Sequence, residues 1–183
     1  MAVMTMSILR KLWKDRRGSA LIETALVAPM AMVACLGLIE FGSYMLLTQK
    51  IQNATMNVAD LAAREEEITV EQLEDLLLSV GEVMAPFDFA ANGVVILTGV
   101  GAETAGDPEV VWQYVSPDDA TVVSQVGSVG GAATLDPNIV VQENDSIVVA
   151  EVVYTYKKSY LGLISDMQIR KSAYYRARIG DFL

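Results

Sequence analysis

The chain has 183 residues, 13 of them Lys or Arg and 23 Asp or Glu, for a formal net charge of −10. It contains no histidine and one cysteine, which excludes Ser-His and Cys-His catalytic dyads, histidine-ligated zinc and disulfides within the chain. The acidic balance also argues against nucleic acid as a partner.

Residues 1–18 form a basic leader. It ends in Arg16, Arg17 and Gly18, and Asp15 is its only acid. An apolar run follows in which Glu23 and Glu40 are the only charged residues up to position 47. Basic residues on one side of an apolar run and acidic sequence on the other place the N-terminus in the cytoplasm.

The apolar run is long enough to cross a membrane. A helix from Ser19 to Glu40 would be about 32 Å long at about 1.5 Å per residue, and a bilayer core is about 30 Å thick. We therefore predict that 19–47 is the transmembrane part of an N-terminal helix, in a single-pass inner-membrane protein with its C-terminal domain in the periplasm.

Two other N-terminal arrangements share this pattern. A cleaved secretory signal would also begin with a basic segment, but the run is too long and no A-x-A site follows. "MVAC" at 32–35 loosely resembles a lipoprotein signal ending at Cys35, yet the next residues stay apolar. Cys35 therefore fits a small apolar residue of the helix.

Small residues recur every third position in this helix, and Pro29 interrupts its hydrogen bonding. Such a strip favours close helix packing, although ordinary membrane-helix composition would produce it too. The strip consists of Ala28, Ala31, Ala34 and Gly37.

Glu23 is an acid just inside the apolar run. A charge at the centre of a bilayer helix costs about 2.5–3.5 kcal/mol and less near the interface, so Glu23 needs a partner or a route to water. One explanation is that it extends to the headgroups near Arg16 and Arg17. The other comes from its distance to Gly18.

The stretch "RRGSALIE" resembles the processing site of type IV prepilins. The resemblance implies that a membrane prepilin peptidase cuts between Gly18 and Ser19 and removes the leader. It also implies that Glu23, fifth in the product, pairs with the new α-amino group of a neighbouring subunit.

Residues 16–64 resemble more narrowly the TadE/TadF-like pseudopilins of tight-adherence (Flp-type) pilus systems. The shared features are R-R-G, E-x-A-L-x-x-P from Glu23, "IEFG" at 39–42 and "NATMNVADLAAR" at 53–64. Thr24 departs from the aromatic residue usual after the glutamate. The resemblance implies a minor pilin without catalytic activity or cofactor, whose partners are the peptidase, other pilins, the inner-membrane assembly platform and the lipid bilayer.

The helix is expected to continue beyond the membrane to about residue 66. Over 48–67 apolar residues recur at steps of three and four, which predicts an amphipathic extension with one face for a sheet; a short coiled coil is the alternative. The repeat comprises Ile51, Ala54, Thr55, Val58, Leu61 and Ala62. Thr69 and Gln72 have capping-box spacing, so a second helix should begin there and end in the eighties.

From residue 92 the pattern is that of strands, predicted at 93–100, 109–115, 146–157 and 167–179. The last two should form a hairpin. Alternation in 167–179 predicts an antiparallel sheet with one wet face carrying Arg170, Arg176 and Arg178, whose charge either meets a partner or balances the domain's own acids. The fold class is α+β and type IV pilin-like, with 68–183 as an extracytoplasmic globular domain.

The loop between the middle strands is rich in Gly, Asp, Pro and Ser. Its acids would suit a calcium site, but solvated loops are the simpler explanation, and we expect no metal. These acids are Asp118, Asp119, Asp136, Glu143 and Asp145.

Two other classes of function remain open. One is an uncleaved single-pass protein with an extracytoplasmic binding or sensing domain. The other is a membrane-tethered hydrolase using paired acids, although no acid pair in the strands has catalytic surroundings.

Overall fold

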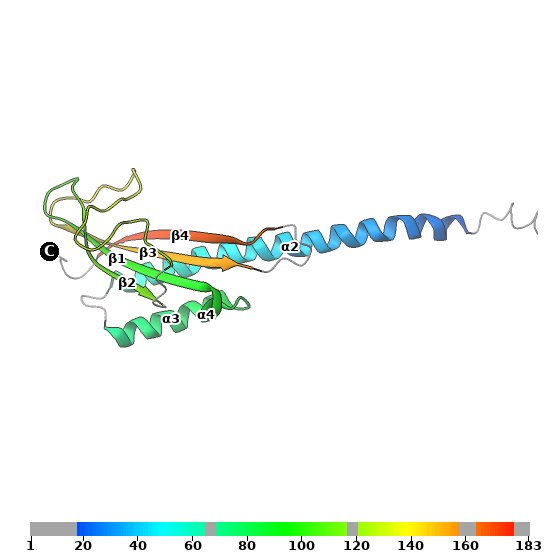
Figure 1. Cartoon of the computed structure of the whole chain (residues 1–183), viewed down its shortest axis with the longest axis horizontal. Coiled ribbons are helices and arrows are strands. Elements are labelled where there is room, and N and C mark those ends of the chain that lie inside the picture. Colours follow the sequence, from blue (N-terminus) through cyan, green and yellow to red (C-terminus); the bar gives the residue numbers. More distant parts are fainter. Residues whose placement is uncertain (1–17, 65–68, 117–120, 158–163, 178–183) are drawn as a thin grey trace, which may run out of the picture.

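The computed structural model describes residues 18–64, 69–116, 121–157 and 164–177 (Figure 1). A long helix leads into a head in which four strands lie beside its second half. The predicted α+β class, with a long N-terminal helix, a short second helix and a C-terminal antiparallel sheet, is confirmed.

Helix α2 (Ser19–Ala62) is a single α-helix of 44 residues, about 66 Å long. Pro29 is accommodated within it. The α-helix ends at Ala62, before the predicted 66, and the amide of Ala63 donates to the carbonyl of Ala59. Residues 65–68 lie outside the described chain.

Helix α3 (Val70–Met84) begins with the predicted capping box. The amide of Gln72 donates to Thr69 Oγ1, and the Gln72 side chain accepts from the Thr69 amide at 2.9 Å. At the other end, Lys50 Nζ from α2 donates to the carbonyl of Val83 at 2.8 Å. A cation at the last carbonyls of a helix is favourable, so this bond ties α3 to α2.

A short helix, α4 (Phe89–Asn92), was not predicted from the sequence. Asp88 caps it by accepting from the amide of Ala91 at 3.1 Å. The Phe89 ring covers Gly93, where a β-carbon would lie 2.2 Å from a ring atom. The helix therefore turns the chain directly into the first strand.

The sheet contains β1 (Gly93–Ala102), β2 (Glu109–Ser116), β3 (Asp145–Tyr156) and β4 (Met167–Arg176) in the order β2-β1-β3-β4. Every neighbouring pair is antiparallel. The predicted hairpin of the last two strands is confirmed. Strand β4 ends at Arg176 rather than 179, and residues 178–183 lie outside the described chain.

One face of the sheet packs against α2 and α3. The predicted apolar face of α2 is largely confirmed, because Ile51, Ala54, Val58 and Ala62 are fully or almost fully buried. Leu61 is the exception, at 41% exposed. The small side chains of this face let the helix backbone come close to the strands, where larger residues of β1 and β3 fill the core.

The opposite face is only in part the wet face that the alternation in 167–179 predicted: Gln168 and Arg176 of β4 are exposed, but the rest of the face is covered. The connection between β2 and β3 folds over it, and Val126 and Val141 are buried there against Val100, Val110 and Val149. Alternating polar residues in a strand indicate that one face of the sheet is less apolar than the other. They do not determine whether water or another segment of the chain covers that face. Here most of that face is covered by a loop without secondary structure of its own.

Gly99 in β1 provides a test of the packing. Its register partner is Trp112, and a β-carbon on Gly99 would lie 2.1 Å from Trp112 Nε1. Overpacking of this kind costs about 1–3 kcal/mol. We expect Gly99→Ala to lose that much unfolding free energy in urea titrations of the full chain in detergent micelles.

Gly81→Ala is the matched control, because Gly81 lies within α3 with open space around it. A glycine-to-alanine change inside a helix stabilises by up to about 1 kcal/mol. Equal effects of the two substitutions would contradict the contact between Gly99 and Trp112.

Candidate processing and assembly site

The predicted scissile bond lies at the first residue of α2. Gly18 is the N-cap, with an ordinary φ of −79°, and its carbonyl accepts from the amide of Ile22 at 3.2 Å. A β-carbon on Gly18 would meet no described atom within 4 Å. The described fold therefore gives no reason for glycine at this position.

Glu23 lies one turn further along α2, on the side of Ser19. Ser19 Oγ donates to Glu23 Oε1 at 3.0 Å. Both residues are exposed, and the side chains around them are apolar and exposed as well: Leu21, Ile22, Leu26 and Val27. The carboxylate thus projects from an apolar helix surface beside the residue that cleavage would make the first.

The remaining predicted residues of this end are only partly described. Ala28, Ala31 and Ala34 are exposed along α2, and Gly37 is half-buried, so the strip is available to another helix along most of its length. Arg16 and Arg17 lie outside the described residues.

The apolar half of α2 has the properties of a membrane span. An 18-residue window in it has a mean hydropathy of 2.0, and none of that window is buried by the rest of the protein. A helix this apolar with no protein cover is stable only in an apolar surrounding. One apolar N-terminal helix fits a single-pass membrane protein.

Comparison with known proteins gives one match. The family model described as TadE-like protein matches residues 18–64. Over this segment, about a quarter of its length, the chain is similar to TadE-like proteins. The match begins at Gly18, the last residue of the leader, and ends two residues after α2, so it covers the helix and none of residues 1–17. Neither the search of curated proteins nor that of solved structures found a match.

The TadE-like segment is similar to proteins of tight-adherence pilus systems. TadE-like pilus proteins are structural. The segment ends before the sheet begins, so the four-stranded head is described by its own structure alone.

Glu40 is a buried acid that sequence reasoning left without a role. It is 1% exposed, and its Oε1 accepts from the backbone amide of Ile164 at 3.1 Å. The two residues are 124 positions apart. In the sequence, the only indication of a special role for Glu40 was a single acid at the end of an apolar run. The structure shows that the segment at Ile164 covers it.

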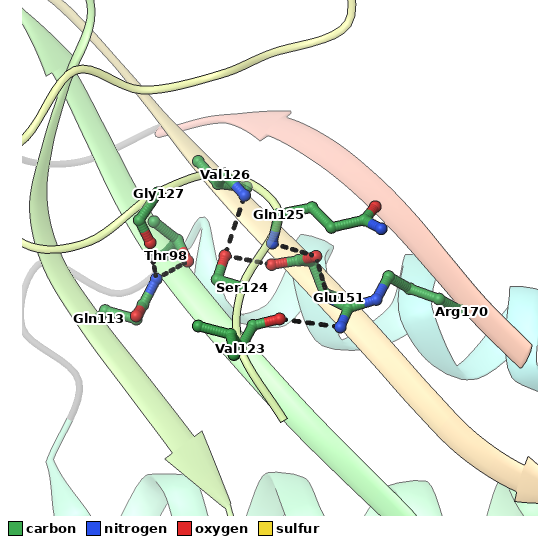
Figure 2. Close-up of polar contacts among 9 residues, drawn as sticks. All are labelled: Thr98, Gln113, Val123, Ser124, Gln125, Val126, Gly127, Glu151 and Arg170. Carbon is green, nitrogen blue, oxygen red and sulfur yellow. Dashed lines mark hydrogen bonds and ion pairs between the residues drawn. The ribbon is translucent and has the colours of Figure 1, made fainter. Parts of the chain in front are cut away.

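Glu151, in the middle of β3, holds the β2–β3 connection on the sheet (Figure 2). Its carboxylate accepts from Ser124 Oγ, from the amide of Gln125 at 3.1 Å and from Arg170 Nη1 at 2.6 Å. Arg170 Nη2 also donates to the carbonyl of Val123 at 2.8 Å. Glu151 is fully buried, so this network satisfies its charge and fixes the connection by the same bonds.

A second bond fixes the same connection from β2. Gln113 Nε2 donates to Thr98 Oγ1 and to the carbonyl of Gly127, each at 3.1 Å. Figure 2 shows both groups converging on residues 123–127. The loop over the second face is therefore held by side chains from three strands.

Tyr174 of β4 packs against the same face. Burial raises the pKa of its phenol above the ordinary 10.0, and the negative charges of Asp136 and Glu151 raise it further. A raised pKa means that folding favours the neutral phenol. This contribution to stability is complete below pH 10 and declines as the pH rises through the raised pKa.

The arginines of the predicted wet row balance acids of the domain itself. Arg170 pairs with Glu151, and Arg176 Nη2 lies 2.7 Å from Asp145 Oδ2. The distance to Asp145 is that of an ion pair without hydrogen-bond alignment. Arg178 lies outside the described residues. A basic docking surface is therefore not formed by Arg170 and Arg176.

The acids considered for calcium do not assemble among the described residues, where no group of three potential metal-ligating acids occurs. Asp136 instead accepts from the amide and side chain of Asn138 at 2.9 and 2.7 Å, and Asp145 faces Arg176. Asp118 and Asp119 lie outside the described residues.

The two arginines of β4 provide a matched pair of variants. Arg170→Met leaves Glu151 buried without its cation, which costs about 3–5 kcal/mol. Arg176→Met removes an ion pair whose arginine side chain is 65% exposed, so we expect a smaller loss than for Arg170→Met. Urea titration of the full chain in micelles should separate the two losses, and limited proteolysis should cut within 121–144 only in the Arg170 variant. Equal losses would contradict the anchoring role of Glu151.

Proposed function

We propose that this chain is a minor pilin or pseudopilin of a tight-adherence pilus, cut by a prepilin peptidase between Gly18 and Ser19. The observation that carries the proposal is the TadE-like match, which starts at Gly18 and follows α2. In this proposal the leader stays in the cytoplasm, the first half of α2 spans the inner membrane, and the head lies in the periplasm or in the pilus.

Two features of the scissile bond support cleavage. Gly18 is the N-cap of α2, so the bond to Ser19 lies in the first turn of the helix, and helix ends fray more readily than helix interiors. The space around its Cα is open in the described structure. We infer that glycine is required at position 18 because the peptidase must bind a residue without a side chain there.

Glu23 has a chemical reason to be where it is once the leader is gone. Cleavage creates a positively charged α-amino group on Ser19, at the edge of an apolar helix. Each charge alone in lipid is costly, and pairing one subunit's amine with another subunit's Glu23 removes both costs together. The bond from Ser19 Oγ to Glu23 Oε1 holds the carboxylate close to the helix start in the uncut chain.

Packing between subunits follows from the same surface. The exposed strip of Ala28, Ala31 and Ala34 lets a neighbouring helix approach closely while the amine and carboxylate pair. The assembly platform of the inner membrane and other pilins are the partners that this surface would meet.

A cavity favours the alternative function, an uncleaved membrane protein that binds a ligand outside the cytoplasm. A cavity of about 490 Å³ lies between α3, α4 and β1, lined by apolar residues that include Leu77, Leu78 and Phe89. Its volume is within the range of small-molecule sites. That alternative predicts a retained leader and no dependence on Glu23.

Cleavage is tested by Gly18→Val. Since the space around Gly18 is open, we expect normal membrane insertion and a protein that keeps its leader, seen by intact mass of the protein from native membranes. Ser19→Ala is the control: it removes the bond to Glu23 but leaves a small residue at the cut, so processing should continue. A processed Gly18→Val protein would contradict the assigned site.

Assembly is tested by Glu23→Ala. We expect a cut, membrane-inserted protein that yields few or no pili, because an α-amino group left without its acid costs up to about 3 kcal/mol, or up to about 100-fold in assembly. Thr24→Ala, whose hydroxyl bonds only the carbonyl of Ala20 in the described chain, should leave piliation unchanged. Normal pili from the Glu23 variant would favour the anchored alternative.

A further inference from the structure

The exposed face of α2 stays apolar beyond Glu40. Phe41, Met45 and Leu46 are 59%, 50% and 43% exposed. Beyond Leu46 the exposed positions are mixed: Gln49 and Asn53 are polar, while Met56 and Leu61 are 43% and 41% exposed. The uninterrupted apolar exposure of the first half of α2 therefore reaches Leu46, not just Ile39.

The other face of the same helical turns is covered by the head. Glu40 and Leu47 are buried, and the ring of Tyr44 meets that of Tyr156 edge-on, with centroids 6.1 Å apart. The amide of Ile164 donates to Glu40. The β3–β4 end of the sheet thus lies along α2 where the helix leaves the protein's cover (Figure 1).

Helix length relates these two faces to a bilayer. From Ser19 to Ile39 the helix is about 32 Å long, and from Ser19 to Leu46 about 42 Å. A hydrocarbon core is about 30 Å thick, and a bilayer with both headgroup layers about 40–45 Å, so one layer is about 5–8 Å deep. With Ser19 at the inner edge of the hydrocarbon, the helix enters the outer headgroup layer at about Glu40, and residues 40–46 run through that layer and just beyond it.

We propose that the β3–β4 end of the head is embedded in the phospholipid headgroup layer of the outer leaflet. In that position one side of residues 40–46 contacts lipid through Phe41, Met45 and Leu46, in continuity with the membrane span. The other side is shielded by the protein's own strands. The occupant of the exposed face is the bilayer itself.

The residues at this end have the chemistry of a membrane interface. Met167 is 40% exposed at the start of β4, and Lys157, just after β3, is exposed as well. Tyr156 is buried beneath them, 4% exposed, and Tyr44 against it is half-buried. A lysine, a tyrosine and an exposed apolar side chain are typical of the headgroup level.

The buried position of Glu40 follows from the same arrangement. A carboxylate at the border of the hydrocarbon is costly when it faces lipid. Covering Glu40 with the strand end and with the amide of Ile164 keeps the charge hydrogen-bonded at that depth. The bond also holds the head at a fixed height on the helix.

The inference rests on the membrane span of the proposed function but not on cleavage or piliation. It is tested with the purified full chain in vesicles of phosphatidylcholine and phosphatidylglycerol. Single cysteines carrying an environment-sensitive fluorophore are placed in a Cys35→Ala background at four exposed positions: Val33, Met45, Asn53 and Met167. A fifth, at Glu103, labels the opposite end of the sheet. Quenchers are lipids with a nitroxide at shallow or deep positions, and aqueous iodide.

The expected result is a blue shift at 45 and 167 with loss of emission to the shallow nitroxide, while labels at 53 and 103 lose emission to iodide alone. A label at 167 that behaves like the one at 103 would overturn the inference. A label at 45 that neither nitroxide lipids nor iodide quench, and only at a high protein-to-lipid ratio, would also overturn the inference. A second copy of the protein would then cover that position.

The label at Val33 separates this inference from the proposed function. If the deep nitroxide quenches 33 but the shallow one does not quench 167, the membrane span stands and the embedded head is wrong. If 33 is not quenched by lipid, both fall.

Discussion

The structure depends on one helix that serves two surroundings. The first half of α2 is apolar on all sides and has no protein around it, while the second half buries one apolar face against the sheet. Leu47, Ile51, Ala54 and Val58 give the strands an apolar surface without charge. Among the described residues the head has no other helix of comparable length to fold against, so loss of this contact would expose the central core.

Two buried acids complete the fold by joining segments that are distant in the chain. Glu40 binds the amide of Ile164, and Glu151 binds the connection around Ser124 together with Arg170. A buried carboxylate lowers the stability of the fold unless it is fully hydrogen-bonded. Each acid therefore favours the one arrangement of the chain that supplies its hydrogen-bond donors. One acid fixes the strand end on α2, and the other fixes the loop on the second face.

Much of this fold was predictable because its helices and strands follow local sequence patterns. The step of three and four in α2, the capping box of Thr69 and the apolar runs of the strands each depend on residues near in sequence. The cover of the second sheet face was missed because its buried side chains, such as Val126 and Val141, follow no period. Strand order and the burial of Glu40 were missed because both are long-range contacts. The candidate site was predicted from the spacing of Gly18 and Glu23. The peptidase and the neighbouring subunit that would act on these two residues are other molecules, so the fold of this chain does not establish what Gly18 and Glu23 do.

The central claim is that α2 begins a mature subunit at Ser19. The most direct measurement is the intact mass and N-terminal sequence of the protein from its native membrane, with the peptidase gene present and deleted. The account predicts a new N-terminus at Ser19 that disappears in the deletion. An intact leader in both strains would contradict it, and would leave a permanently anchored protein in which Glu23 extends to the headgroups.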